Sequence, residues 1–312
     1  ALLVCVMLGV AVVVVLFGAS SIDKPQSIDD LLTRIESDPG EKTMGIMLWP
    51  GARESWQAAQ ILARRLEHKG GLDPDEAEPV ARRIIAILEK ESSARIRDGV
   101  AAERGRARRH FLISALGLLP SSNAIDMLVK CLGDDEAQTR QAALQALARM
   151  RHQSAARHVL PEIYPLLNDA VPEVRIVACL TVASLADRDD AVAIREVSHL
   201  LEADREIQWN AAQALARMGS KRGKLVLMNM LDRGFWEKVE LNYEDKNAPV
   251  HRKFTEMEVV RYLNAAVAAA ACLDDAELKA MIVNLRDGDS SFAVREAARV
   301  AIEKVDSEAV KS

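Results

Sequence analysis

The sequence has few residues that interrupt helices and few aromatic residues. Its 312 residues include 15 glycines, 10 prolines and 12 aromatic residues (four Trp, three Tyr, five Phe), while about half of the chain is apolar. Such a composition excludes a disordered or fibrous chain and a small disulfide-rich domain. The chain is therefore expected to be ordered and mostly helical, and it is too long to fold around one small core.

Cysteine is scarce and scattered. Of the four cysteines, Cys5 lies in an apolar run at the start of the chain, and Cys131, Cys179 and Cys272 occur singly within apolar helical patterns. No CxxC pair is present, so neither a disulfide framework nor a thiolate metal site is indicated. The three later thiols are expected to pack as small hydrophobic side chains.

The motifs of common catalytic and cofactor sites are also missing. The sequence contains no GxSxG, no GxGxxG and no HExxH, and GSKRGK from Gly219 lacks the spacing and the final Ser or Thr of a phosphate loop. Histidine and cysteine never occur together at metal-ligand spacing. No catalytic residue, no cofactor and no metal ligand is therefore predicted, and the chain is not expected to be an enzyme.

No strong charge of either sign exists. The formal net charge is -5 over the whole chain, which is too small to create a global field for nucleic acid or an acidic substrate. Any binding of that kind would have to be local.

What the chain does have, first, is a long apolar run. Residues 1–19 carry no charge, and as a helix they would be about 30 Å long, enough to cross a bilayer core. They are predicted to be a transmembrane anchor in contact with membrane lipid. The alternative is a secretory signal peptide, with Gly18-Ala19-Ser20 as its cleavage site.

The segment after this run is rich in acidic residues, which outnumber Lys24 and Arg34 up to residue 38. Cytoplasmic flanks are usually rich in Lys and Arg, so the expected location is a single-pass membrane protein with its body on the non-cytoplasmic (periplasmic or extracellular) side. Residues 20–51 are predicted to be a linker and an N-terminal cap, in which Ser27 and Asp30 form a capping box for a helix that ends near Ser37.

The body of the chain repeats one alanine-rich phrase. It occurs as WQAAQILARR from Trp56, RQAALQALARM from Arg140 and WNAAQALARM from Trp209, and looser copies begin at Arg109, Arg175, Arg261 and Arg295. From Arg109 to Trp209 the copies are 31, 35 and 34 residues apart. A shorter predicted helix precedes each later copy, so the repeating unit is a helix pair. Alanine recurs because neighbouring helices must approach closely.

An acidic turn followed by an arginine in the second helix resembles the HEAT repeat family. The resemblance is carried by Asp134 and Asp135 before Arg140, Asp169 before Arg175, and Asp287 and Asp289 before Arg295. It implies an all-α fold, an α-solenoid of about six helix pairs over residues 52–306, followed by a C-terminal tail at 307–312. It also implies a structural ladder made of Asp135, Arg140, Asp169, Arg175, Asp289 and Arg295. The copy at Trp209 keeps Asp204 but lacks the arginine, so the ladder is expected to be interrupted there.

The period is broken at residues 234–253, GFWEKVELNYEDKNAPVHRK. This insertion places Phe235, Trp236 and Tyr243 beside charged residues that include Arg252 and Lys253. Aromatic anchors next to charge are typical of interface hot spots, so these five residues are candidates for binding a partner. A chain without residues 235–252 is then expected to keep its helicity and melting. The alternative is a loop that folds back over its own repeat and buries Trp236.

A second break lies at about residues 92–108. It contains the basic residues Arg95, Arg97, Arg104, Arg106 and Arg108, which are candidates for binding anionic lipid head groups or an acidic partner. Nucleic acid is an unlikely partner, because no aromatic residues are interleaved and no nucleic-acid-binding fold is recognised. The alternative is a solvated helix face paired with local acids.

Together these features predict a membrane-anchored, non-catalytic scaffold or accessory subunit that binds protein subunits of a larger membrane complex. Two alternatives stay open. One is an enzyme similar to the phycobilin lyases, which share this repeat type and would need a chromophore-sized pocket with converging polar groups. The other is an adaptor or assembly chaperone that binds transiently.

Overall fold

The structure is a computed structural model that describes residues 27–37, 50–68, 72–93, 100–245 and 248–309. The predicted transmembrane anchor at 1–19 lies outside these ranges. Within them, no helix is both long enough and apolar enough to cross a bilayer. The chain divides into two compact units, residues 1–115 and 116–312, which are considered separately.

The described residues of the first unit form four helices: α2 (Ile28–Glu36), α3 (Pro50–His68), α4 (Pro74–Ser93) and α5 (Val100–Leu116), the last of which ends at the unit boundary. The predicted capping box of α2 is confirmed, because the Asp30 amide donates to the Ser27 hydroxyl and the Ser27 amide donates to the Asp30 carboxylate, both at 3.0 Å. Arg83 of α4 binds Asp29 and Glu36 of α2. These ion pairs attach the short helix α2 to α4.

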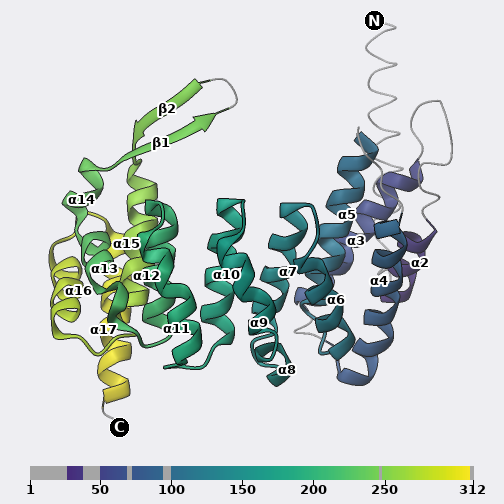
Figure 1. The fold of residues 1–312 in the computed structure, drawn as a ribbon, viewed down its shortest axis with the longest axis horizontal. Coiled ribbons are helices and arrows are strands. Elements are labelled where there is room, and N and C mark those ends of the chain that lie inside the picture. Colours follow the sequence, from purple (N-terminus) through teal and green to yellow (C-terminus); the bar gives the residue numbers. More distant parts are fainter. Residues whose placement is uncertain (1–26, 38–49, 69–71, 94–99, 246–247, 310–312) are drawn as a thin grey trace, which may run out of the picture. The chain divides into compact units, whose positions relative to one another are not determined.

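The described part of the second unit consists of helix pairs (Figure 1). Their bounds are α6 (Ser122–Leu132) with α7 (Ala137–Arg149); α8 (Ser154–Arg157), α9 (Leu160–Ile163) and the 3-10 helix η2 (Tyr164–Asn168) with α10 (Pro172–Leu185); α11 (Ala191–Ser198) and η3 (His199–Glu202) with α12 (Arg205–Arg217); η4 (Lys221–Gly223) and α13 (Lys224–Leu231) with α15 (Glu256–Ala270); and α16 (Ala276–Gly288) with α17 (Phe292–Ala309). The second helices α7, α10, α12, α15 and α17 pack in this order in one layer. This arrangement is an α-solenoid.

Small residues set the spacing between neighbouring helices, as the alanine pattern predicts. At Gly223 a Cβ atom would lie 2.7 Å from the Cα atom of Ala212 in α12, closer than two such carbon atoms can pack. Gly219 has a φ of 83°, a left-handed conformation that glycine adopts without strain. The two glycines of GSKRGK are therefore required by the turn and by the packing of the helix pair.

The insertion departs from the all-α expectation. It begins with the short helix α14 (Arg233–Lys238) and continues as an antiparallel hairpin of β1 (Glu240–Asp245) and β2 (Ala248–Lys253). The register pairs Glu240 with Lys253 and Tyr243 with Val250. In β1, polar and apolar residues alternate with the period of two that is typical of a strand, a pattern that a search for helical repeats overlooks.

Aromatic residues form the core where the insertion joins the solenoid. The ring of Trp236 in α14 stacks on Tyr262 of α15 with centroids 4.9 Å apart, and it meets Trp209 of α12 edge to face, also at 4.9 Å. Phe235 and Phe254 pack on the same rings. Trp236 is 1% exposed, and its indole N–H donates to the Met230 carbonyl at 3.0 Å. Both ends of the insertion therefore contribute to the core between α12 and α15.

The position of Trp236 leads to a stability prediction. The change Trp236→Ala should lower the free energy of unfolding by about 3–5 kcal/mol, because it leaves a cavity and an unpaired Met230 carbonyl. Urea unfolding followed by helical circular dichroism and tryptophan fluorescence measures this loss. The control Leu225→Ala, at an exposed position of α13, should change the value by less than about 0.5 kcal/mol. Equal effects of the two changes would contradict the core role of Trp236.

Candidate functional site

The basic segment is described by the structure only in part. Arg95 and Arg97 lie outside the described residues, and Arg104 and Arg106 lie in α5. Arg108 contacts Glu91 of α4 at 2.7 Å and donates to the Ser55 hydroxyl of α3 at 2.8 Å. Its side chain is only 14% exposed. The prediction that Arg108 binds an anionic partner is therefore wrong, because its guanidinium is used to join three helices of the first unit.

The structure separates the residues of the insertion into two groups. Trp236 is a core residue and cannot act as a surface anchor, so for this residue the alternative of a buried indole holds. Phe235 is partly buried against Trp209. Deleting residues 235–252 would remove both side chains from the core, and unchanged melting is no longer expected. The remaining candidates lie at or beyond the base of the hairpin.

Arg252 ties the hairpin to the first turn of α15. Its guanidinium donates to both carboxylate oxygens of Glu258, at 2.7 and 2.8 Å. The same carboxylate accepts from the Thr255 amide and hydroxyl at 2.8 Å and completes a capping box. These donors, with Arg252 first, hold the pKa of Glu258 far below its ordinary value. The partner-binding candidate Arg252 thus has a structural role, whereas Lys253 next to it is exposed.

A small pocket lies at the base of the hairpin. It has a volume of about 270 Å³, and Trp236, Phe254 and Val259 form its apolar part. Its charged lining residues are Arg233, Glu237, Lys253 and Glu256. An apolar floor with charges around it is the usual setting in which one side chain of a partner is buried.

Arg233 holds this base in place. Its guanidinium binds both carboxylate oxygens of Asp289, at 2.7 and 2.8 Å, and it also donates to Glu256 at 2.9 Å. The Asp289 side chain is 1% exposed. A buried carboxylate requires a cation and hydrogen-bond donors. Arg233 supplies the cation and the hydrogen-bond donors. It is the first residue of α14 and directly precedes residue 234, where the repeat spacing predicted that the insertion begins.

The same geometry occurs at Asp169, within the predicted ladder. Arg140 of α7 binds both oxygens of Asp169 at 2.8 Å, and the Val171 amide donates to this carboxylate at 2.9 Å. Arg175 donates to the Asp169 carbonyl at 2.8 Å. Each complete step of the ladder therefore joins an arginine of one helix pair to the aspartate that precedes the second helix of a later pair.

Two details of the ladder differ from the prediction. The aspartate equivalent to Asp169 and Asp289 is Asp134 rather than Asp135, because the amide two residues later donates to its carboxylate at 2.9 Å and its carbonyl accepts from Arg140 at 2.8 Å. In α12 the arginine position, fourth in the helix, is Gln208 and not Trp209. Gln208 donates to the Leu201 carbonyl at 2.6 Å.

The ladder is interrupted at this helix pair, as expected. In the part of the chain that the structure describes, Arg175 makes no ion pair with Asp204. Arg295 makes none either: it donates to the carbonyls of Asp289 at 2.6 Å and Ser290 at 3.1 Å and lies over the Phe292 ring. The carboxylate of Asp289 is bound by Arg233 instead. The insertion therefore restores a ladder contact that the regular repeat does not supply.

The comparisons with known proteins agree with this architecture. Residues 159–188, which include Asp169 and Arg175, match the family model described as HEAT repeat. This match and the helix-pair stack support a HEAT-like α-solenoid. No curated protein matches the chain.

Among solved structures, the chain is similar to two engineered proteins, with 16% and 18% identity over 89% of this chain and 97% and 99% of theirs, at TM-scores of 0.36 and 0.37. It is also similar to human deoxyhypusine hydroxylase in complex with glycerol, with 14% identity over 89% of this chain and 96% of that one, at a TM-score of 0.31. Among the described residues of the present chain, no three His, Cys, Asp or Glu side chains gather as a metal site would require.

Removing Arg233 should be costly. Arg233→Ala leaves Asp289 buried without its cation, and breaking such a pair typically costs about 3–5 kcal/mol of unfolding free energy. Urea unfolding measures the loss, and the double variant Arg233→Ala/Asp289→Asn should recover part of it because the buried charge is gone. Arg195→Ala, at an exposed arginine, is the matched control. A loss no larger than that of the control would contradict the role of Arg233.

The ion pair also predicts a pH dependence. Burial raises the pKa of Asp289, but the hydrogen bonds from Arg233 and the Ser291 amide lower this pKa by more than burial raises it, so the net shift is downward. A lowered folded-state pKa stabilises the fold above the unfolded pKa of about 4, and this contribution is lost as the pH falls through the folded value.

Below pH 4 the free energy of unfolding of the wild type should therefore fall more steeply than that of Asp289→Asn. Urea unfolding at a series of pH values measures the slope. Asp204→Asn is the control, because Asp204 makes no side-chain capping bond. Equal slopes for wild type and Asp289→Asn would exclude this contribution.

Proposed function

We propose that the protein is a membrane-anchored, non-catalytic scaffold or accessory subunit, and that it binds protein partners of a larger membrane complex through its hairpin and the pocket at the hairpin base. A HEAT-like solenoid is a protein-interaction architecture that presents an extended surface built from neighbouring repeats. The membrane location, the complex and the non-catalytic role are the proposed parts.

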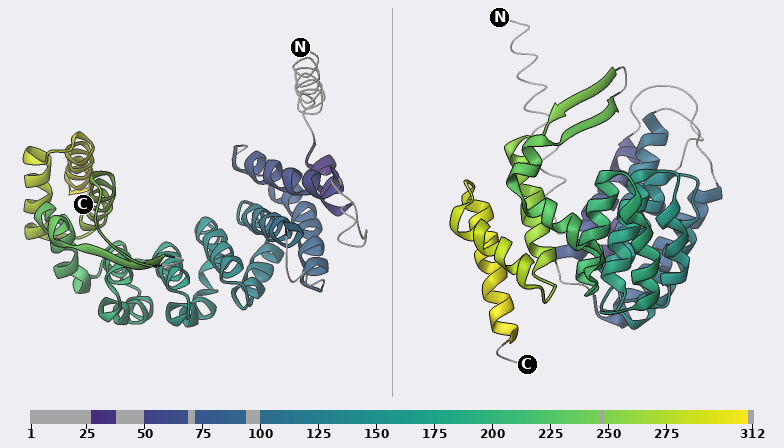
Figure 2. Two further views of the ribbon diagram at one scale, coloured as in Figure 1. Left: turned by 90° about the horizontal axis from the view of Figure 1, so that it is seen from above. Right: turned by 60° about the vertical axis from the view of Figure 1, so that its left-hand side comes forward.

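The hairpin is the observation that carries the proposal. It projects beyond the ends of α12 and α15 (Figures 1 and 2). Its two strands pack on each other and make few contacts with the other described elements. A two-stranded hairpin is only marginally stable by itself. Its outer edges offer unpaired backbone groups to another chain. A partner that covers the hairpin would satisfy these groups and stabilise it.

The register gives the hairpin two unlike faces. The positions of one face are Leu241, Tyr243, Asp245, Ala248, Val250 and Arg252, and those of the other face are Glu240, Asn242, Glu244, Pro249, His251 and Lys253. The first face has four apolar positions between Arg252 at the base and Asp245 near the tip, and it contains the predicted contact residue Tyr243. A partner with an apolar strand or loop would cover these four positions, and the pocket at the hairpin base, lined by Lys253 of the other face, would take one of its side chains.

The membrane part of the proposal is supported by the sequence. Residues 1–19 form an uncharged apolar run with the length of a bilayer span, and acidic residues follow it. An anchor would raise the effective concentration of the solenoid near other membrane proteins. Arg104 and Arg106 of α5 stay candidates for contacts with anionic lipid head groups.

The hairpin can be tested with a shortened chain. Replacing residues 242–251 with Asn-Gly keeps Trp236, the Arg252 side chain and the core, so helicity and melting temperature should change little. Recovery of stoichiometric partners from native membranes, measured by quantitative mass spectrometry, should fall at least about tenfold, as expected when hot-spot residues are lost. The control is Leu225→Ser, an exposed apolar residue on α13. Unchanged recovery of every partner would contradict the proposal for the hairpin.

The membrane part has a separate readout. The full chain should stay in the membrane fraction after carbonate extraction, and a chain that begins at residue 20 should be soluble. Release of the full chain by carbonate would contradict the anchor without bearing on the hairpin.

A further inference from the structure

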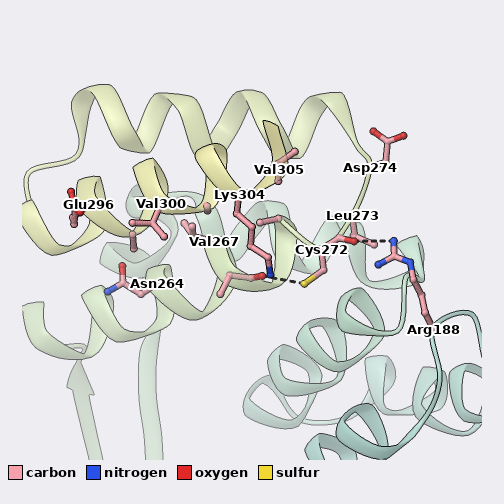
Figure 3. Close-up of a pocket in the computed structure, with 14 residues that line it drawn as sticks. Arg188, Asn264, Val267, Cys272, Leu273, Asp274, Glu296, Val300, Lys304 and Val305 are labelled. Atoms are coloured by element: carbon pink, nitrogen blue, oxygen red, sulfur yellow. Dashed lines mark hydrogen bonds between the residues drawn. The ribbon is translucent and has the colours of Figure 1, made fainter. Parts of the chain in front are cut away.

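A groove of about 870 Å³ lies between α15 and α17 (Figure 3). Its walls are mainly small apolar residues from the two helices: Val267, Ala271, Ala297, Val300, Ala301 and Val305. Val300 is 51% exposed. Small side chains on both walls leave room between the helices for an extended chain.

Charged and polar groups are distributed unevenly along the groove. Figure 3 shows Glu296 and Asn264 toward one end and Arg188 at the other, with Lys304 pointing toward Cys272 between them. Arg188 donates to the Cys272 carbonyl at 3.1 Å, and within the described structure no carboxylate pairs with it. Glu296 is bound by Arg299 at 2.6 Å. Asp274 also lines the Arg188 end of the groove (Figure 3), so this end has one carboxylate beside the guanidinium that a negatively charged group would bind.

Asn264 has an unmet hydrogen-bonding requirement. Its Oδ1 atom is buried and accepts no hydrogen bond from the residues that the structure describes, and a buried acceptor without a donor costs free energy. A hydrogen-bond donor on an occupant of the groove would meet this requirement. A peptide backbone has one N–H per residue and suits a side-chain amide, whereas the acyl chain of a lipid has no donor at all.

We infer that this groove binds an extended peptide segment of a partner protein, with an apolar centre against Val267 and Val300, a backbone N–H on Asn264, and an acidic end at Arg188. The chemistry of the walls selects the apolar centre, and the guanidinium of Arg188, which has no carboxylate partner among the described residues, selects the acidic end.

Peptide selection tests this inference on the full chain. A phage-displayed library of random 12-residue peptides is selected on the purified protein, and enriched sequences are synthesised with blocked ends and measured by fluorescence anisotropy. The expected peptides have an apolar centre and Asp or Glu at one end. Their affinity should fall at least about tenfold in Asn264→Leu and in Val300→Glu, the loss expected for one buried hydrogen bond or an unpaired buried charge.

Matched controls separate groove binding from loss of folding. Val192→Glu changes a valine of similar exposure, 45%, on α11, and Arg195→Glu changes an exposed arginine outside the groove; neither should alter the affinity. Arg188→Glu should reverse the preference from acidic to basic peptide ends. Asn264→Leu removes an unsatisfied buried acceptor, so it should melt no lower than the wild type and stays a usable variant.

Three results would overturn the inference. The first is that selection on the wild type enriches no peptides beyond those enriched on Val300→Glu, and the second is that Asn264→Leu, Val300→Glu and Arg188→Glu all leave peptide affinity unchanged. The third is that the protein binds dodecanoate and no peptide is recovered, which would indicate a lipid site. The hairpin-shortened chain keeps the groove and should bind the same peptides with the wild-type affinity. The hairpin proposal and the groove proposal can therefore fail independently.

Discussion

A buried carboxylate must be paired with a cation, and at Asp289 this requirement determines how the C-terminal half of the solenoid is built. The aspartate before α17 needs an arginine, as Asp169 does, and Arg233 comes to it from the insertion. By binding Glu256 as well, Arg233 joins the start of the insertion to the start of α15 and to the turn before α17. The loop that breaks the repeat is thus the part that continues the ladder.

Aromatic residues also join the insertion to the solenoid. In most helix pairs alanine and leucine fill the core, but between α12 and α15 the rings of Trp209, Trp236 and Tyr262 take their place. Larger side chains fit here because the insertion brings additional chain into the layer. The hairpin then leaves from a rigid base, held by Arg233 on one side and by Arg252 and Glu258 on the other. A rigid base positions a binding element more accurately than a free loop can.

The fold could largely be predicted from the sequence, because an alanine-rich period of 31 to 35 residues has few structural solutions. The acidic turn and arginine at Asp169 and Arg175 predicted the ladder, while its register was one residue off at Asp134 and at Gln208. Trp236 showed the limit of the method. An aromatic residue inside an insertion has the same pattern whether it packs inward or outward, and only the positions of Trp209 and Tyr262 decide between the two.

The candidate sites were harder to predict, because they depend on contacts between residues far apart in the sequence. Arg233 and Asp289 are 56 residues apart, and no local pattern marks them as a pair. The basic residues near Arg108 illustrate the opposite case. The sequence shows a dense run of positive charge, but Arg108 contacts Glu91 and Ser55 within the first unit. The groove gave no signal at all, since its walls consist of the same alanines and valines that form the core elsewhere.

The two ends of the hairpin share one core with α12 and α15, and this has a mechanical consequence. Val239 and Phe254, at the two ends of the hairpin, pack in the same core as Trp236. The strands therefore cannot move at their base without displacing side chains of the α12–α15 core.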